Sequence, residues 1–220
     1  MVKNIIFDFG GVIVHLQPDE AIRRFEALGI SDARQQMDIF GQTGIFGQVE
    51  KGELTTDEFS RLLALEAQEK GGKFQGIDNP SYSYEETQWG WMGYIKAVPQ
   101  KNLDTLLRLQ QRYNLYLLSN LNPFLQQWAE STEFSGDGHG LRHYIPYLYY
   151  SFQLRDYKPA PSIFQKMMHA AGLRAEECVF VDDSPRNIIG CESVGMRGLL
   201  VAKDEDWTER LDDLLSKAEK

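Results

Sequence analysis

Cysteine is scarce in this chain, and an excess of basic residues is absent. Only Cys178 and Cys191 occur among 220 residues, so the sequence offers no framework of disulfides. The 32 acidic residues outnumber the 23 lysines and arginines, which gives a formal net charge of −9 at pH 7. Because proteins bind nucleic acids largely through clustered Lys and Arg, we expect no nucleic-acid partner.

Long apolar runs are also missing. No run reaches the roughly 18 residues that a membrane-spanning helix needs, and Asp8 interrupts the apolar N-terminal stretch. We therefore expect a cytoplasmic protein without a membrane partner, either a monomer or a dimer. Hydrophobic residues make up 42% of the chain, which excludes a disordered protein and is typical of a globular one.

Short apolar segments that end in polar residues alternate with helical patterns along most of the chain. β-Branched and aromatic residues in the apolar segments favour buried strands. Residues 101–113 and 161–171 repeat apolar side chains with helical spacing. The alternation predicts an α/β fold, a Rossmann-like parallel sheet with helices on both faces. The predicted strands are residues 4–7, 115–118, 147–150, 178–181 and 198–201.

Residues 16–98 differ from the rest because they carry no convincing strand pattern. We interpret them as an all-helical domain inserted into an α/β domain formed by residues 1–15 and 99–220. Signals for the starts and ends of helices inside the insertion are the capping boxes Thr55/Glu58 and Ser83/Glu86 and the glycine pair Gly71–Gly72.

Polar residues stand where the predicted strands end. Since the carboxyl ends of parallel strands meet at one edge of the sheet, these side chains should converge. Carboxylate oxygens suit Mg²⁺, a Lys neutralises phosphoryl oxygens, and an Asp can attack phosphorus to form an aspartyl phosphate. The residues concerned are Asp8, Ser119, Asn120, Lys158, Asp182 and Asp183.

In this order, the residues resemble the motifs of the haloacid dehalogenase superfamily of hydrolases, in its branch with an α-helical cap. The nucleophile motif of the family matches residues 7–12 (FDFGGV), and its strand-ending hydroxyl matches Ser119. Its Lys before Pro matches Lys158, and its acidic pair matches residues 182–183. Each motif alone is weak, but four in the family's order are a strong signal. The resemblance covers essentially the whole chain and is greatest to sugar-phosphate phosphatases such as α-glucose-1-phosphate phosphatase.

The resemblance implies a Mg²⁺-dependent phosphatase for a small phosphorylated metabolite, with a sugar phosphate as the favoured class. Asp8 would be the nucleophile, Ser119 would bind a phosphoryl oxygen, and Lys158 would neutralise Asp8 and the phosphate together. The implied metal contacts are Asp8, Asp183, the carbonyl of Gly10 and, through a water, Asp182. The implied phosphate contacts include the backbone N–H groups of Phe9, Gly10 and Asn120.

One position departs from the family's pattern. Most phosphatases of the superfamily have a second Asp, two residues after the nucleophile, that protonates the leaving alcohol, whereas this chain has Gly10. General acid–base assistance is typically worth about 10²–10⁴-fold in rate. His15 is one candidate replacement. The departure also predicts a preference for acidic leaving groups, such as those of aryl, acyl or anomeric phosphates.

Two other functions remain open from the sequence. A 2-haloacid dehalogenase also attacks with an Asp and lacks the second Asp, because halide leaves without a proton. It needs no metal, however, and the pair Asp182–Asp183 beside Asp8 would repel strongly without a cation. A catalytically weak binding protein of the same fold is the second alternative, supported only by Gly10.

Several further residues have two interpretations each. His139 and His143 have the spacing of metal ligands on a helix, but the glycines around them predict a loop. The aromatic residues between 82 and 94 could line a pocket, although packing among helices is favoured. Asn187 is either a partner of the acidic pair or an ordinary residue of a first helical turn. By the resemblance, the cap residues best placed to face the site are Phe46 and Glu50.

Overall fold

The computed structural model describes residues 1–38, 41–70 and 73–218, so the predicted helix break at Gly71–Gly72 lies outside the described residues. Five strands form a central sheet in the order β7-β6-β1-β8-β9, and all neighbours are parallel. This confirms the predicted α/β architecture. The strands are β1 (Asn4–Phe7), β6 (Asn114–Ser119), β7 (Tyr147–Tyr150), β8 (Cys178–Asp182) and β9 (Arg197–Leu200).

The middle of the sheet is buried on both faces, which explains its nearly continuous apolar sequence. Every residue of β1 and β8 is buried. Side chains alternate between two apolar clusters: Ile5 and Phe7 belong to the larger one, and Ile6 belongs to the smaller one. The two clusters are the two sides on which helices pack.

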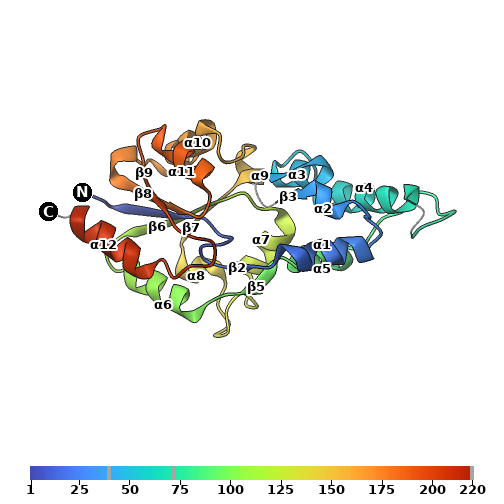
Figure 1. Ribbon diagram of the computed structural model, residues 1–220, viewed down its shortest axis with the longest axis horizontal. Helices are drawn as coiled ribbons and strands as arrows, with labels where there is room; N and C mark the ends of the chain where they lie inside the picture. Colours follow the sequence, from blue (N-terminus) through green and yellow to red (C-terminus); the bar gives the residue numbers. More distant parts are fainter. Residues whose placement is uncertain (39–40, 71–72, 219–220) are drawn as a thin grey trace.

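Helices cover both faces of the sheet (Figure 1). On one face, α6 (Gln100–Leu109) and α12 (Thr208–Ala218) bury leucines against the larger cluster. On the other face, α10 (Pro161–Ala171) and α11 (Pro185–Glu192) supply apolar residues to the smaller cluster. The remaining helical segments of this part of the chain are α7 (Pro123–Glu130), α8 (Leu141–Tyr144), α9 (Ser151–Leu154) and η1 (Ala175–Glu177).

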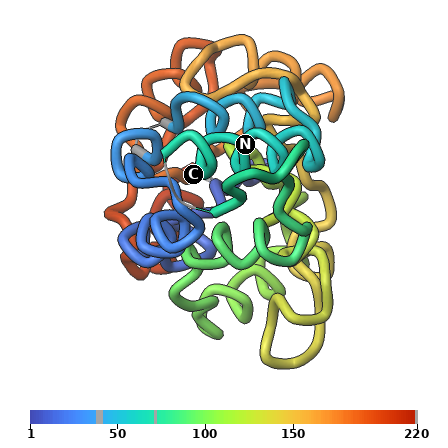
Figure 2. Tube along the Cα trace, turned by 90° about the vertical axis from the view of Figure 1, so that its right-hand side faces the viewer, coloured from blue at the N-terminus to red at the C-terminus, as the bar shows by residue number. Residues whose placement is uncertain are grey.

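The helices α1 to α5, which lie between β2 and β5 in the chain, stand beyond the carboxyl ends of the strands, at the end of the molecule opposite both termini (Figure 1). Seen from that end, they stand in front of the sheet (Figure 2). Both predicted capping boxes are present, at the first residues of α4 and α5. The helices are α1 (Pro18–Ala27), α2 (Ala33–Gln36), α3 (Gly44–Glu50), α4 (Thr56–Glu69) and α5 (Tyr84–Met92).

These helices pack around a group of buried aromatic rings. Phe25, Phe46, Phe59 and Trp91 contact one another with ring centroids 4.8–5.7 Å apart, mostly edge to face. Trp91 therefore takes part in packing among the helices, as the packing interpretation expects. None of the described helices combines the length and the apolar character needed to cross a membrane.

The expectation that residues 16–98 contain no strand was wrong. β2 (His15–Leu16) pairs antiparallel with β5 (Ile95–Ala97), and β3 (Met37–Asp38) pairs with β4 (Gly41–Gln42). Strands of two or three residues are too short to produce an alternating pattern that a sequence can reveal. The β2–β5 pair places side by side the two segments through which the chain enters and leaves the helical insertion, close to the predicted boundaries. The division into two domains itself stays a prediction.

Candidate active site

All of the predicted site residues except Asp182 lie in the walls of one cavity of about 350 Å³, between the sheet edge and the helical insertion. β1 leads into Asp8, β6 ends at Ser119, and β8 ends at Asp182. Parallel strands thus deliver their polar ends to one edge, as expected. From the predicted set, the cavity walls include Asp8, Phe9, Gly10, Ser119, Asn120, Lys158 and Asp183.

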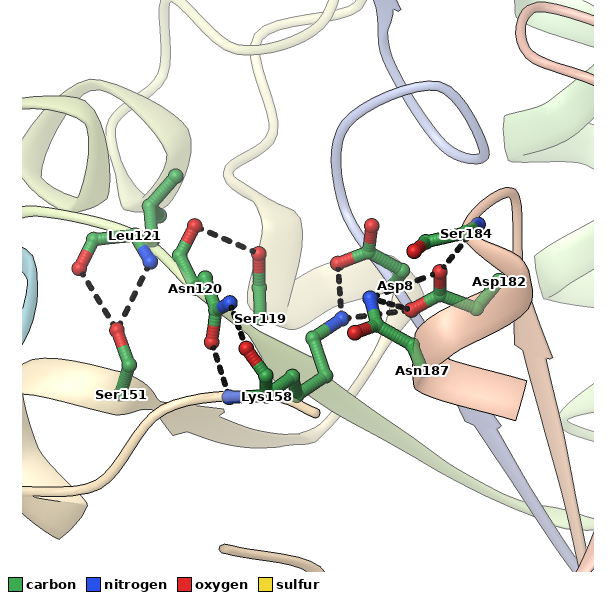
Figure 3. A network of polar contacts seen from close by, with 9 residues as sticks. All are labelled: Asp8, Ser119, Asn120, Leu121, Ser151, Lys158, Asp182, Ser184 and Asn187. Atoms are coloured by element: carbon green, nitrogen blue, oxygen red, sulfur yellow. Dashed lines mark hydrogen bonds and ion pairs between the residues drawn. The ribbon is translucent and has the colours of Figure 1, made fainter. Parts of the chain in front are cut away.

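Lys158 forms the centre of the charged cluster (Figure 3). Its Nζ donates to Asp8 Oδ1 at 2.8 Å and to Asp182 Oδ2 at 2.7 Å, and its side chain is only 1% exposed. The ammonium also lies 5.1 Å from the ring centroid of Phe180. Burial acts to lower the pKa of Lys158, but the adjacent charges of Asp182 and Asp8 outweigh it, and the pKa is raised. Lys158 is therefore a fixed positive charge beside Asp8.

Asp182 stands behind the cavity wall and is fully buried. Its Oδ1 accepts from the backbone N–H of Ser184 at 2.8 Å, and Asn187 Nδ2 lies 3.0 Å from both of its oxygens. Of the two interpretations of Asn187, the structure therefore supports the one in which it is a hydrogen-bond partner of the acidic pair. Because both oxygens of Asp182 already accept hydrogen bonds from these donors and from Lys158, the oxygens of Asp183 are more accessible from the cavity.

The three carboxylates carry more negative charge than Lys158 can balance. Each of Asp8, Asp182 and Asp183 offers an oxygen within 4.8 Å of the others. Burial, and then the charge of Asp8, raise the pKa of Asp183 to about 7, and burial also raises the pKa of Asp182. Hard oxygen ligands with surplus negative charge fit a divalent cation such as Mg²⁺.

The loop after β1 is shaped by two glycines. A Cβ on Gly11, whose φ is +79°, would lie 2.3 Å from Asp183 Oδ2, so only glycine allows this close approach. A Cβ on Gly10 would lie 2.7 Å from Leu16 Cδ1. The space next to Gly10 is therefore taken by an apolar side chain.

Asn120 has a role that the sequence did not reveal. Its side chain exchanges two hydrogen bonds with the backbone of Lys158: Nδ2 donates to the carbonyl at 3.0 Å, and Oδ1 accepts from the N–H at 2.9 Å. This pair joins the end of β6 to the loop before α10. The contact holds Lys158 in place, and no spacing rule links two residues 38 positions apart.

The insertion contributes a buried acid to the cavity. Glu50, at the end of α3, lines the wall, and its Oε2 accepts from the hydroxyl of Tyr157 at 2.7 Å. Burial raises the pKa of Glu50 to about 8. The expectation that Glu50 faces the site is met, whereas that for Phe46 was wrong, because Phe46 is buried in the aromatic group. Glu50 is thus an acid that stays protonated near neutral pH.

The histidines considered from the sequence, and most of the aromatic residues, lie outside the cavity walls. His15 is in β2 and is not among the residues that line the cavity. The rings of His139 and His143 stack 4.0 Å apart, with His139 Nδ1 3.2 Å from Asp137. Among the described residues, these side chains belong to no group of three that could share a metal ion. Of the aromatic residues, Trp91 and Tyr94 line the cavity, while Tyr82, Tyr84 and Trp89 do not.

Comparison with known proteins identifies relatives of this chain. The chain is 40% identical over 216 residues, 98% of its length and 100% of the relative's, to a D-ribitol-5-phosphate phosphatase of Bacteroides thetaiotaomicron. A solved HAD-like hydrolase of Porphyromonas gingivalis superposes with a TM-score of 0.87 at 31% identity, covering 98% of each chain. A HAD family enzyme of B. thetaiotaomicron, solved with magnesium and inorganic phosphate, has a TM-score of 0.81 at 28% identity, covering 96% of this chain and 99% of that one. Since the model of the haloacid dehalogenase-like hydrolases also matches residues 2–195, the chain belongs to that hydrolase family.

Proposed function

We propose that this protein is a Mg²⁺-dependent phosphatase that hydrolyses a small sugar or polyol monophosphate through an aspartyl phosphate on Asp8. The observation that carries the proposal is the buried Lys158, held between Asp8 and Asp182 next to the open oxygens of Asp183. The phosphatase activity named for the 40% identical relative supports it, as does the neighbour solved with magnesium and phosphate.

In this mechanism each residue has a separate task. The Asp8 carboxylate attacks phosphorus, and the paired Lys158 places a positive charge beside that carboxylate and attracts the phosphoryl oxygens. Ser119 and the backbone N–H groups of Phe9, Gly10 and Asn120 would bind the phosphate. In the loop after β1, the N–H of Val14 donates to the carbonyl of Phe9, and the N–H of Gly11 donates to the carbonyl of Val14. Neither bond uses the Gly10 carbonyl, which could therefore bind the metal.

Asp8, Asp183 and the Gly10 carbonyl would hold Mg²⁺, with Asp182 acting indirectly. When bound, Mg²⁺ would neutralise negative charge on the phosphate and on these carboxylates. The raised pKa of Asp183 supports this assignment, because a site with that much uncompensated negative charge is costly without a cation.

The cavity supports a small hydroxylated substrate. Trp91 and Tyr94 provide aromatic wall, and Gln42 donates to the Tyr94 hydroxyl at 2.8 Å. Within the described part of the chain, two buried polar atoms of these walls have no hydrogen-bond partner: Gln42 Oε1 and Trp91 Nε1. An acceptor and a donor beside aromatic rings suit the hydroxyl groups of a sugar or an alditol.

The substrate assignment also agrees with the distribution of charge. The proposed cap, residues 16–98, carries 14 acidic and 8 basic residues and therefore most of the chain's surplus negative charge. This field should favour a monophosphate over a polyanionic substrate. We propose that the insertion closes the cavity from water and selects the substrate.

The dehalogenase alternative is less well supported. A dehalogenase needs no metal, so Asp183 would have no role in it, and its carboxylate would lie beside those of Asp8 and Asp182 with no cation to balance their charge. The binding-protein alternative gives no reason for a Lys buried against the nucleophile.

The test is phosphate release from a panel of pentitol, sugar and aryl monophosphates, with and without Mg²⁺. We expect release that EDTA abolishes and that Asp8→Asn lowers by at least about 10³-fold. Equal rates for wild type and Asp8→Asn would overturn the proposal. Chloride release from a 2-chloro acid in EDTA would instead establish the dehalogenase.

A further inference from the structure

The site lacks an obvious donor for the leaving group. An alkoxide leaving from phosphorus needs a proton, and Gly10 offers no side chain at the position where the family usually has an Asp. Leu16 fills the space beside Gly10, with its Cδ1 2.7 Å from where a Cβ would be. A donor must therefore come from another part of the cavity wall.

Few groups in the described wall can donate a proton near neutral pH. Asp8 is needed as an anion, and Asp183 faces the cation site. Lys158 is engaged with two carboxylates, and the hydroxyl of Tyr157 already donates to Glu50. Lys203 stands at the exposed edge of the cavity. Glu50 is the remaining carboxyl group of the wall, on the side of the cavity formed by the insertion.

Glu50 is held at two points by segments that also carry the reacting groups. Its Oε2 accepts from Tyr157, the residue that directly precedes Lys158 in the chain. Its backbone carbonyl lies 2.6 Å from Ser151 Oγ, which accepts from the N–H of Leu121 at 3.0 Å, two residues after Ser119. The side chain is thus anchored relative to the phosphate-binding loops, although it belongs to the insertion.

We propose, building on the phosphatase function above, that Glu50 is the general acid and base that replaces the Asp missing at Gly10. In the first step an Asp8 oxygen bonds to phosphorus while the bond from phosphorus to the ester oxygen breaks. The ester oxygen keeps the electron pair and takes the proton of Glu50, so the alcohol leaves neutral. In the second step water attacks phosphorus and gives a proton to the Glu50 carboxylate, and the bond to Asp8 breaks with its electrons returning to Asp8.

The surroundings of Glu50 keep it protonated until it is needed. Burial raises its pKa to about 8, while the side chains of Tyr157 and Asn122 that face it lower the pKa only in part. Lys51, the next residue in the chain, places its Nζ 5.9 Å from the ring centroid of Tyr157. Because the acid form is the active one in the first step, phosphorylation by an alkyl phosphate should fail as the pH rises through about 8.

The experiment compares Glu50→Gln with wild type in single-turnover and burst kinetics with Mg²⁺. With an alkyl phosphate, such as a pentitol phosphate, we expect phosphorylation of the enzyme to fall by about 10²–10⁴-fold. With p-nitrophenyl phosphate, whose leaving group needs no proton, we expect a burst of about one equivalent of nitrophenol at the wild-type rate, followed by slow turnover. The matched control is Glu53→Gln, an exposed residue in the loop that follows α3.

Equal losses in the burst rate and the alkyl rate would overturn the proposal, since a merely structural role slows both. Unchanged alkyl kinetics would overturn it too. Tyr157→Phe is the second test: without its hydrogen bond the pKa of Glu50 should rise, and the basic limb of the alkyl pH profile should shift to higher pH. If wild type releases no phosphate from any substrate, the phosphatase function itself fails, and that outcome is distinct.

Discussion

At the residue scale, the site depends on charges that compensate one another while buried. Lys158 and Asp182 are buried, Asp8 is nearly so, and the Lys158 ammonium pairs with both carboxylates. Removing one member therefore does more than delete a contact. It leaves an uncompensated charge where water cannot solvate it.

Lys158→Met should abolish activity and lower the free energy of unfolding by about 3 kcal/mol at pH 8, since loss of one partner of a buried ion pair typically costs about 3–5 kcal/mol. Chemical denaturation measures the change. Lys166→Met is the matched control, because Lys166 is half exposed and its 2.9 Å pair with Asp156 lies on the surface. A change in stability as small as that of the control would contradict the compensation argument.

The pKa of Asp183 gives a prediction for metal binding. In the metal-free protein this carboxyl has a pKa of about 7, above its ordinary value of 3.8, so the folded state binds the proton more tightly than the unfolded chain does. Stability without metal should then fall as the pH rises from about 4 to 7. Mg²⁺ should raise the melting temperature more at pH 8 than at pH 5. Asp183→Asn should lose most of this pH-dependent gain, and a gain that is independent of pH would argue against the assignment.

At the element scale, local signals identified most helices before the tertiary structure was considered. The helix predicted at residues 161–171 is α10, and both capping boxes begin helices with the reciprocal bonds that the motif requires. Such elements are encoded locally, because a cap satisfies backbone N–H groups within four residues of itself. The short strands were missed, because β3 and β4 are too short to show an alternating pattern and β2 pairs with the distant β5.

Thr55→Ala should therefore destabilise the protein without affecting catalysis. Thr55 Oγ1 accepts from the N–H of Glu58 at 3.2 Å, and the Glu58 carboxylate accepts from the N–H of Thr55 at 2.8 Å. Loss of an N-cap costs about 1 kcal/mol, which denaturant unfolding can measure. Thr43→Ala is the control, since Thr43 precedes α3 but makes no capping bond with its side chain. Equal effects of the two substitutions would show that the box contributes nothing.

At the scale of the whole molecule, the proposed role of Glu50 depends on how the helical insertion packs against the part of the chain that forms the sheet. Gly52 follows α3 with a φ of +72°, and a Cβ there would lie 2.2 Å from the carbonyl oxygen of Phe152 in α9. The backbone after α3 thus lies against the backbone of α9, two residues from Glu50. We expect this contact to help position Glu50 over the cavity.

Gly52→Ala should push α3 away from α9 and lower kcat/KM by about 10-fold or more for an alkyl phosphate, because small misplacement of a reacting group is costly. Gly76→Ala is the matched control: its φ is +73°, but nothing lies within 4 Å of the added Cβ. It should share the loss in stability from backbone strain and keep full activity. If both variants retain activity, the contact at Gly52 does not position the site.

The sequence by itself determined the parallel α/β core and the residues at its edge. Asp8 follows β1, and Ser119 and Asp182 end β6 and β8, so the topology of a parallel sheet brings them together. Lys158 lies farther along, in the loop between α9 and α10. Only the tertiary structure decided which residues of the helical insertion line the cavity across from these side chains. The exclusion of Phe46 from the cavity, the bonds from Asn120 to Lys158 and the contact of Glu50 with Tyr157 all join segments that no local pattern relates. They depend on how an insertion of helices packs over the sheet, and that packing is a property of the folded chain as a whole.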